Sequence, residues 1–157
     1  NNLVKITVRE AEDQDIPLLQ ALSNKLVIDN QQYDDDVVMD WATGDKGKQY
    51  FSRYVTDKDC AVLIAFGSHE RIAYVAFGPK VIEYRKSKYL EIDSICVSPD
   101  YQSKGIGKLL IGKVKDWGKQ NGYHKLFVNS YFKNHRAIEF YKRNGFKEID
   151  VALEMEI

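Results

Sequence analysis

The 157-residue sequence has few of the features that mark disordered, fibrous or membrane proteins. It has only three prolines and no low-complexity tract, while 44% of its residues are apolar, and this composition favours a packed globular core. No apolar run approaches the roughly 20 residues that a membrane-spanning helix needs, so no membrane partner is expected. No internal repeat or flexible linker divides the chain. We therefore expect one continuous domain over residues 1–157.

Cysteine is also scarce. Cys60 and Cys96 lie far apart and neither belongs to a CxxC pair, which gives no support for a zinc or redox motif and favours two reduced, buried thiols. No metal site is expected. The opening stretch "NNLVKITVRE" lacks the basic-then-apolar layout of a signal peptide, and the sequence thus predicts a cytoplasmic protein.

The chain has no net charge, with 23 basic and 23 acidic residues, but the two signs are separated along it. Residues 101–145 hold ten basic and two acidic groups, a net charge of +8, and residues 1–60 hold seven basic and twelve acidic groups, a net charge of −5. The densest acidic cluster is "NQQYDDD" at 30–36. One part of the chain is suited to an anion and the other to a cation, although solvated helix faces would also explain many of these charges.

The apolar periodicity predicts alternating strands and helices. The amino-terminal half reads as a strand over 3–10, a helix from 16 to Asp29, a short helix through 48–55, and an antiparallel hairpin formed by 60–66 and 72–84. The rest reads as a strand over 89–97, a helix from Ile106 to Gly122, a strand over 124–130, a helix over 134–145, and one long or two short strands over 146–157. This order predicts an α/β protein of the mixed α+β kind.

Three of these elements have sided patterns. In the strand 89–97 the alternation places Leu90, Ile92 and Ser94 on one face and Glu91, Asp93 and Ile95 on the other. The helix after Ile106 has an apolar stripe of Ile106, Leu109, Leu110, Val114 and Trp117. The helix over 134–145 turns Ala137, Ile138, Phe140 and Tyr141 inward.

Two glycines interrupt the basic stretch "QSKGIG", residues 102–107, where a strand ends and a helix begins. The first amides of a helix lack partners and its dipole is positive there, so this position is suited to an anion. Glycine permits positive φ and close approach of a phosphate, and Lys104 and Lys108 add positive charge. No GK[ST] follows, and the first glycine of the dinucleotide fingerprint is missing. A tight turn would explain the glycines equally well if they stood alone.

A second motif accompanies this one. "QSKGIG" resembles the Q/R-x-x-G-x-G/A signature of the GCN5-related N-acetyltransferases (GNAT), and "NHRAIEFYKRNGF", residues 134–146, is similar to that family's N-x-x-A-x-x-F-Y-x-x-x-G-F helix. The resemblance implies a GNAT-like fold, with a mostly antiparallel central sheet splayed between its fourth and fifth strands and about four flanking helices. It also implies acetyl-coenzyme A (acetyl-CoA) as donor and an amine as acceptor.

The resemblance assigns donor-binding roles to three segments. The loop would hold the pyrophosphate through Gln102, Ser103, Lys104, Gly105, Ile106, Gly107 and Lys108. The strand end would contribute Cys96 and Val97, with the Val97 N–H polarising the thioester carbonyl. The second motif would contribute Asn134, Arg136, Ala137 and Tyr141. Asn134 would contact the pantetheine arm or cap its own helix, and Arg136 would reach the outer phosphates or only solvent.

Catalysis requires a proton acceptor and a proton donor. Tyr141 occupies the family's general-acid position, although an aromatic packed in the core would fit the same pattern. Glu91 is the leading base, because it lies eleven residues before Gln102, the spacing found in the histone-acetylating branch of the family. Asp93 shares its strand face, and mutual repulsion would raise the pKa of one carboxyl. Two solvated surface acids are the alternative.

The sequence features that concern the acceptor site are less specific. In the family, the loop between the first two helices walls the acceptor site, and here that region carries Asp29, Tyr33, Asp34, Asp35 and Asp36. Together with Glu91 this wall would favour a cationic amine, although a run of Asp would also fit a solvated loop. The segment after Phe146 is short for the family's final hairpin, which would open the acceptor side or indicate a homodimer.

The sequence therefore predicts an enzyme, an N-acetyltransferase that acts by direct attack of a primary amine in a ternary complex. The alternative is an acyl-CoA-binding sensor or interaction module without turnover, which would need neither Glu91 nor Tyr141. Nucleic acid is not an expected partner, because the basic segment carries no recognised binding motif.

Overall fold

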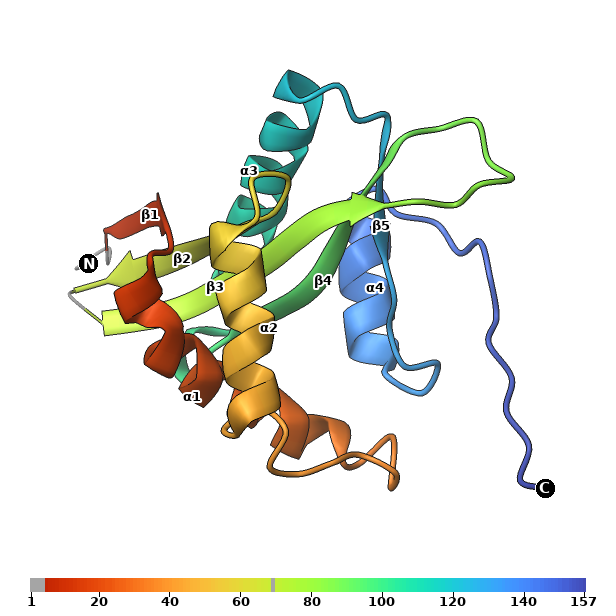
Figure 1. Ribbon diagram of the computed structural model, residues 1–157, viewed down its shortest axis with the longest axis horizontal. Helices are drawn as coiled ribbons and strands as arrows, with labels where there is room; N and C mark the ends of the chain where they lie inside the picture. The colour runs from red at the N-terminus through yellow and green to blue at the C-terminus, as the bar shows by residue number, and fades with distance from the viewer. Residues whose placement is uncertain (1–4, 69) are drawn as a thin grey trace.

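The computed structural model describes residues 5–68 and 70–157 and contains one five-stranded sheet (Figure 1). Its strands, in spatial order β1-β2-β3-β4-β5, are β1 (Ile6–Glu10), β2 (Ala61–Gly67), β3 (Glu70–Lys80), β4 (Tyr89–Val97) and β5 (Lys125–Val128). Neighbouring strands are antiparallel except β4 and β5, which are parallel. The mixed, mostly antiparallel sheet expected from the sequence is confirmed.

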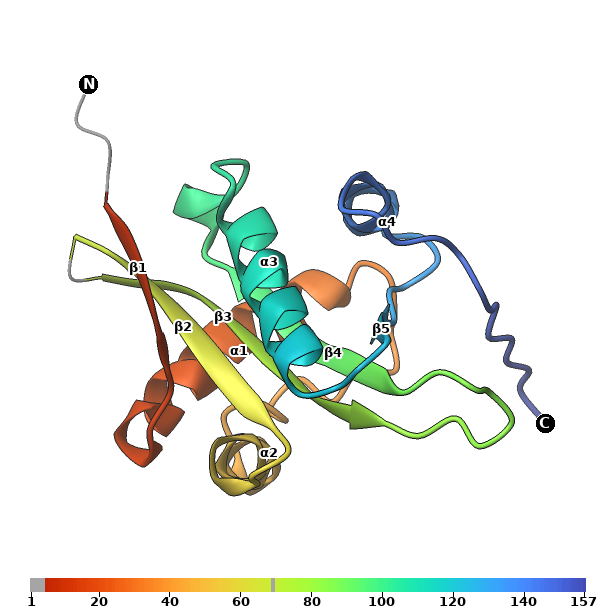
Figure 2. The ribbon, with the colours of Figure 1, turned by 90° about the horizontal axis from the view of Figure 1, so that it is seen from above.

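Two helices lie on each face of this sheet. They are α1 (Ile16–Asn30), α2 (Asp45–Thr56), α3 (Ile106–Gln120) and α4 (His135–Arg143), joined in places by the short 3-10 turns Asp13–Asp15 and Pro99–Tyr101. Helices α1 and α2 cover one face, and α3 and α4 lie on the other (Figure 2). Within the described ranges, no helix is both long and apolar enough to cross a membrane.

Both faces of the central strands are buried. On the α1–α2 face, Leu19, Phe51 and Tyr74 belong to one apolar cluster, and on the α3 face Phe77 and Leu110 belong to another. Burial of such side chains stabilises a fold by roughly 2 kcal/mol each. This packing fixes β3 and β4, and with them the groups that the sequence analysis singled out.

The fourth and fifth strands separate halfway along β4. Their parallel pairing covers only Tyr89–Ile92 of β4, whereas β3 pairs with β4 as far as Val97. Asp93 is an extra residue in β4, because Phe77 pairs with Ile92 and the adjacent Ala76 pairs with Ser94. Such a bulge bends a strand and increases its twist. The expected splay between β4 and β5 is thus confirmed, and it begins at this bulge.

The bulge also corrects one expectation. Ser94 was expected on the same face as Leu90 and Ile92, but its hydroxyl lies 2.6 Å from that of Tyr74, which belongs to the cluster on the α1–α2 face. The expectation was wrong because an extra residue shifts the two-residue alternation that follows it. Leu109 likewise does not belong to the buried stripe of α3: its side chain is 38% exposed, whereas Leu110 and Val114 are fully buried.

The predicted carboxy-terminal strands are absent. Residues 147–157 are exposed and belong to no strand, and this segment leaves α4 and extends away from the sheet (Figure 1). The alternating pattern is that of a strand, but a strand requires hydrogen bonds to a neighbour, and the segment forms no ladder with β5.

Candidate functional site

The loop 102–107 forms the start of α3 and presents backbone amides. Ser103 has φ +61° and Gly105 has φ +83°, both in the left-handed region. Gly105 occupies the N-cap position, where no side chain satisfies the first amides of the helix. Ile106 is buried and anchors this end of α3 in the core. The loop therefore offers unpartnered N–H groups at the positive end of a helix, the arrangement suited to a phosphate.

Gly107 has a role in packing in addition to the one expected. A Cβ at this position would lie 2.7 Å from Cζ of Phe140, so glycine permits α3 and α4 to approach closely. Arg136 of α4 also reaches the loop, since its Nη2 donates to Ser103 Oγ over 3.3 Å. The two motifs recognised in the sequence are therefore in direct contact.

The backbone of Val97 faces the opening between β4 and β5. The Ser98 N–H donates to Ile72 O over 2.7 Å, toward β3. Because successive N–H groups of a strand point to opposite sides, the Val97 N–H points away from β3. Gln102 lies on the same side, because its Nε2 donates to Val97 O over 3.2 Å. Cys96 differs: its buried thiol donates to Leu22 O of α1, so its side chain belongs to the core.

Tyr141 lies on the inner side of α4. Its ring packs between Phe140 and Phe146, with centroid distances of 5.4 and 5.6 Å. It contacts the apolar cluster to which Val97 and Val128, the last residues of β4 and β5, also belong. Burial raises the pKa of Tyr141 to about 12, so the phenol keeps its proton at neutral pH.

Asn134 and Ala137 define the start of α4. Asn134 Oδ1 accepts a hydrogen bond from the Ala137 N–H over 3.1 Å, so the N-cap role of Asn134 is confirmed. This bond uses only the oxygen of the amide.

Glu91 and Asp93 lie on the α1–α2 side of β4. Burial raises the pKa of the half-buried Glu91, and the charge of Asp93 adds to the effect, while Lys80, whose Nζ lies 3.7 Å from Glu91 Oε2, opposes it. Tyr50 of α2 donates a hydrogen bond to Asp93, and burial, followed by the charge of Asp93, raises the pKa of Tyr50. The two carboxyls thus occupy different surroundings, one beside a cation and one bound to a phenol.

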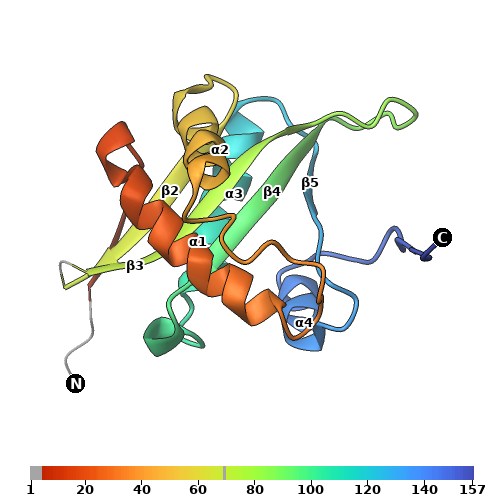
Figure 3. The ribbon, with the colours of Figure 1, turned by 60° about the horizontal axis from the view of Figure 1, so that its bottom comes forward.

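The segment between α1 and α2 reaches the β5–α4 connection (Figure 3). Tyr131 donates to Asp34 Oδ2 over 2.7 Å and stacks on Tyr33 with a centroid distance of 6.1 Å. The hydrogen bond from Tyr131 lowers the pKa of Asp34. Asp29 is separate from this pair: it lines a groove of about 360 Å³ with Lys25, Ser98 and Asp100. The structure therefore divides the expected acceptor wall into two places.

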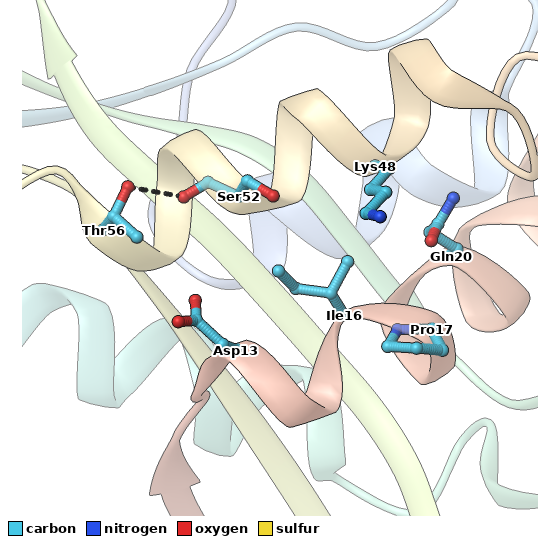
Figure 4. Close-up of a pocket in the computed structure, with 7 residues that line it drawn as sticks. All are labelled: Asp13, Ile16, Pro17, Gln20, Lys48, Ser52 and Thr56. Carbon is cyan, nitrogen blue, oxygen red and sulfur yellow. Dashed lines mark hydrogen bonds between the residues drawn. The ribbon is translucent and has the colours of Figure 1, made fainter.

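A second groove, of about 580 Å³, lies between α1 and α2 (Figure 4). It is lined by Asp13, Ile16, Pro17, Gln20, Lys48, Ser52 and Thr56. It shares no residue with the loop 102–107, β4 or α4, and none of its residues was a predicted site residue.

Three residues near the predicted site were missed by the sequence analysis: Lys80, Tyr50 and Tyr131. Only Tyr131 stood near a recognised motif, three residues before Asn134. In the part of the chain that the structure describes, no group of three or more His, Cys, Asp or Glu side chains is placed to hold a metal ion.

Comparison with known proteins decides the family. The Acetyltransferase (GNAT) family profile matches residues 23–146, most of the chain. The chain belongs to this family.

Curated relatives match parts of the chain. It is 41% identical over 67 residues to an uncharacterized N-acetyltransferase of Methanocaldococcus jannaschii, covering 43% of this chain and 30% of that protein. It is 29% identical over 103 residues to streptothricin acetyltransferase A of Bacillus subtilis, covering 63% of this chain and 60% of that protein. The chain thus spans less than two thirds of the length of either relative.

The fold extends over nearly the whole chain. An aminoglycoside N-acetyltransferase solved in complex with CoA superposes with a TM-score of 0.78, covering 99% of this chain and 97% of that one at 16% identity. At this identity the likeness establishes the shared fold.

Proposed function

We propose that the protein transfers an acetyl group from acetyl-CoA to the primary amine of a cationic small molecule or peptide, by direct attack in a ternary complex. The observation that carries the proposal is the placement of two kinds of group on β4. The Val97 N–H faces the opening toward β5, and the carboxyls of Glu91 and Asp93 lie on the α1–α2 side. A donor and an acceptor bound on these two sides would meet at one strand.

The residues present fit acetyl-CoA. The amides of the loop 102–107 would bind the pyrophosphate, and Lys104, Lys108 and Arg136 supply positive charge around them. The edge of β4 from Asp93 to Val97 has no strand beside it on the β5 side. The pantetheine arm would pair with backbone groups there other than the Val97 carbonyl, which already accepts from Gln102. When bound, acetyl-CoA supplies the activated acetyl group.

The chain's own groups would then handle charge and protons. The Val97 N–H would donate to the carbonyl oxygen as negative charge develops there, a contact worth roughly 3 to 4 kcal/mol when water is excluded. Glu91 would accept the proton that the ammonium must lose before its nitrogen forms the new C–N bond. Tyr141 would donate its proton to the sulfur as the C–S bond breaks. The raised pKa of Glu91 suits a base near neutral pH, and Tyr141 holds the proton that it would donate.

A cationic acceptor is supported by the charges around the proposed site. Glu91 and Asp93 on β4 and Asp34 beside Tyr131 are acidic groups near the opening of the sheet. The enzymes named above act, by their names, on streptothricin and on an aminoglycoside. Free, buried Cys60 and Cys96 are compatible with the cytoplasmic location that we propose.

The test is release of free CoA thiol from acetyl-CoA across a panel of polyamines, aminoglycosides, amino acids and lysine peptides. We expect release above the hydrolytic background with at least one cationic amine, and loss of at least 100-fold in Glu91→Gln, whose side chain is similar in size but is not a base. Thermal stabilisation by acetyl-CoA without thiol release from any amine would overturn the proposal in favour of a sensor.

A further inference from the structure

Two successive residues of β4, Asp93 and Ser94, have their side chains on the same face of the sheet. Asp93 accepts a hydrogen bond from Tyr50 of α2, and the hydroxyl of Ser94 lies 2.6 Å from that of Tyr74 of β3, on the α1–α2 side. In a regular strand successive side chains point to opposite faces, so this pair marks the bulge. Each of the two bulge residues therefore forms a hydrogen bond with a tyrosine hydroxyl from another element.

The two tyrosines are held by one aromatic neighbour. Phe51 of α2 is fully buried and packs edge-on with both rings, at centroid distances of 4.9 Å to Tyr50 and 5.5 Å to Tyr74. Tyr74 is also fully buried, and burial raises its pKa, so its hydroxyl keeps its proton. Because protein interiors are close-packed, a hydroxyl on such a ring has little freedom to leave its partner.

The bulge determines which amides of β4 face the opening toward β5. In the first half of β4, Phe77 pairs with Ile92, and continuation of that register would place Val97 opposite Ile72. The Val97 N–H would then donate to Ile72 O. In the observed register the Ser98 N–H makes this bond, over 2.7 Å, and the Val97 N–H points away from β3. The one-residue shift at the bulge therefore turns the Val97 N–H toward the opening.

We propose that Tyr50 and Tyr74 are positioning residues for the Val97 N–H, and that they act by holding the bulge at Asp93 and Ser94. A bulge leaves one residue outside the ladder, so contacts of its side chains decide where along the strand it forms. In a strand without the bulge, every later side chain would change face, and Ser94 would leave Tyr74 for the apolar α3 side. A fully buried phenol would lose its partner, which is unfavourable.

This inference rests on the proposed function, in which the Val97 N–H donates to the thioester carbonyl, and it adds two residues to that function. Neither tyrosine lies on the donor side of β4, since both belong to the packing of α1 and α2 against the sheet. Substitutions behind the strand should therefore alter acetyl transfer in front of it.

The test compares Tyr74→Phe, Ser94→Ala and the double variant Tyr74→Phe/Ser94→Ala. Each single variant leaves one hydroxyl without its partner, so the free energy of unfolding should fall, whereas the double variant removes both hydroxyls and should recover most of the loss. Denaturant unfolding measures these changes. If Tyr74 only packs in the core, kcat for thiol release should recover together with stability, and that result would overturn the proposal.

We expect kcat to remain low in the double variant. Loss of an oxyanion donor slows turnover by roughly 100-fold or more. Ile95 and Val97 pack with the α3 cluster in the observed register and also favour it, so we expect a partial effect, a fall in kcat of about tenfold. The Kd for acetyl-CoA should change by less than about threefold, because the loop 102–107 has its own contact with Arg136.

Amide hydrogen exchange tests the register without any ligand. The Ser98 N–H donates to Ile72 O in the bulged register, and a strand without the bulge would lose this bond. Exchange at Ser98 should therefore be faster by about tenfold or more in Tyr50→Phe and in the double variant. Unchanged exchange at Ser98 in the double variant would overturn the proposal. Faster exchange in a protein that releases no thiol with any amine would support the role of the tyrosines and overturn only the proposed function.

Tyr54→Phe is the matched control. Tyr54 belongs to the same helix as Tyr50 and packs on it with a centroid distance of 4.8 Å, but its ring lies against Gly78, which pairs with Glu91 before the bulge. Removal of its hydroxyl should change neither kcat nor the exchange at Ser98. An effect as large as that of Tyr50→Phe would mean that any change in this aromatic cluster disturbs β4, and would overturn the specific role of the two hydroxyls.

Discussion

The two sides of β4 present different kinds of chemical group. Toward β5, the candidate groups are backbone amides: Val97 at the strand end and the start of α3, set by positive φ at Ser103 and Gly105. Toward α1 and α2, they are titratable side chains, Glu91 and Asp93, positioned by Lys80 and Tyr50. Backbone donors fix a site that any member of a family with one donor substrate can share. Side chains vary independently, so the face that we propose for the acceptor is where specificity can change.

The largest expected effect separates chemistry from donor binding. Tyr141→Phe removes only the proposed proton donor, so we expect kcat for thiol release to fall by about 100-fold with the Kd for acetyl-CoA within twofold of wild type. Turnover is measured by thiol release and binding by calorimetry. Tyr123→Phe is the control. Tyr123 follows α3 and stacks on Trp117 of that helix, so this variant should change neither kcat nor the Kd for acetyl-CoA. Equal losses of binding and turnover in Tyr141→Phe would contradict this division.

The next effect tests the close packing of α3 against α4, which positions the backbone amides of the loop 102–107. Gly107→Ala would bring a methyl group against Phe140, and we expect a loss of about 2 kcal/mol in the free energy of unfolding, as for other overpacked sites. Acetyl-CoA binding should weaken as well, because the loop and α4 would move apart. Denaturant unfolding measures the change in stability, and calorimetry measures the change in acetyl-CoA binding.

Gly112→Ala is the matched control in the same helix. A Cβ at Gly112 meets no atom within 4 Å, so the change should stabilise the protein by roughly 0.5 to 1 kcal/mol. If the two alanine variants had the same stability, close contact between α3 and α4 would not be the reason for glycine at 107.

A pH profile tests the side-chain face. Lys80 lowers the pKa of Glu91, in opposition to burial, so Lys80→Met should raise that pKa further. If deprotonated Glu91 is the base, kcat/KM increases with pH along an acid limb, and this limb should move to higher pH in Lys80→Met. Lys86→Met, in the exposed β3–β4 connection, is the control. A limb that stays in place or moves to lower pH would exclude Glu91 as the base.

The smallest effect concerns acceptor binding. Tyr131→Phe removes the hydrogen bond that holds Asp34, so we expect KM for the cationic amine to rise by about threefold with kcat unchanged. The pKa of Asp34 should return toward its ordinary value, since that bond is the main reason it is lowered. Steady-state kinetics at low salt measure the first effect. A change in kcat instead of KM would place Tyr131 closer to the chemistry than we propose.

The backbone side was predictable because its determinants are local. Positive φ at Gly105 and the N-cap at Asn134 depend on residues within a few positions, and both were visible as spacings in the sequence. The order and type of the central elements followed from periodicity in the same way, including β4, whose limits 89–97 were predicted as observed.

The side of β4 that faces α1 and α2 depends on contacts between residues far apart in the sequence, which no short sequence pattern predicts. Tyr50 is 43 residues from Asp93, and Tyr131 is 97 residues from Asp34. The position of Ser94 was missed because nothing in the alternation of "YLEIDSICV" reveals a bulge. At 146–157 the pattern was that of a strand, but pairing requires an edge, which sequence periodicity cannot supply.

The opening between β4 and β5 depends on a single residue, because it begins at the bulge that Asp93 forms. On either side of Asp93, the pairing of β3 and β4 is regular, and the two registers differ by a single position. Deletion of Asp93 would therefore leave an uninterrupted ladder, in which all the remaining residues of β4 keep their partners in β3. The strand would straighten, and its second half could then align with an extended β5. Such a variant would convert a forked sheet into a continuous one, with no opening between β4 and β5 for the donor that we propose to bind there.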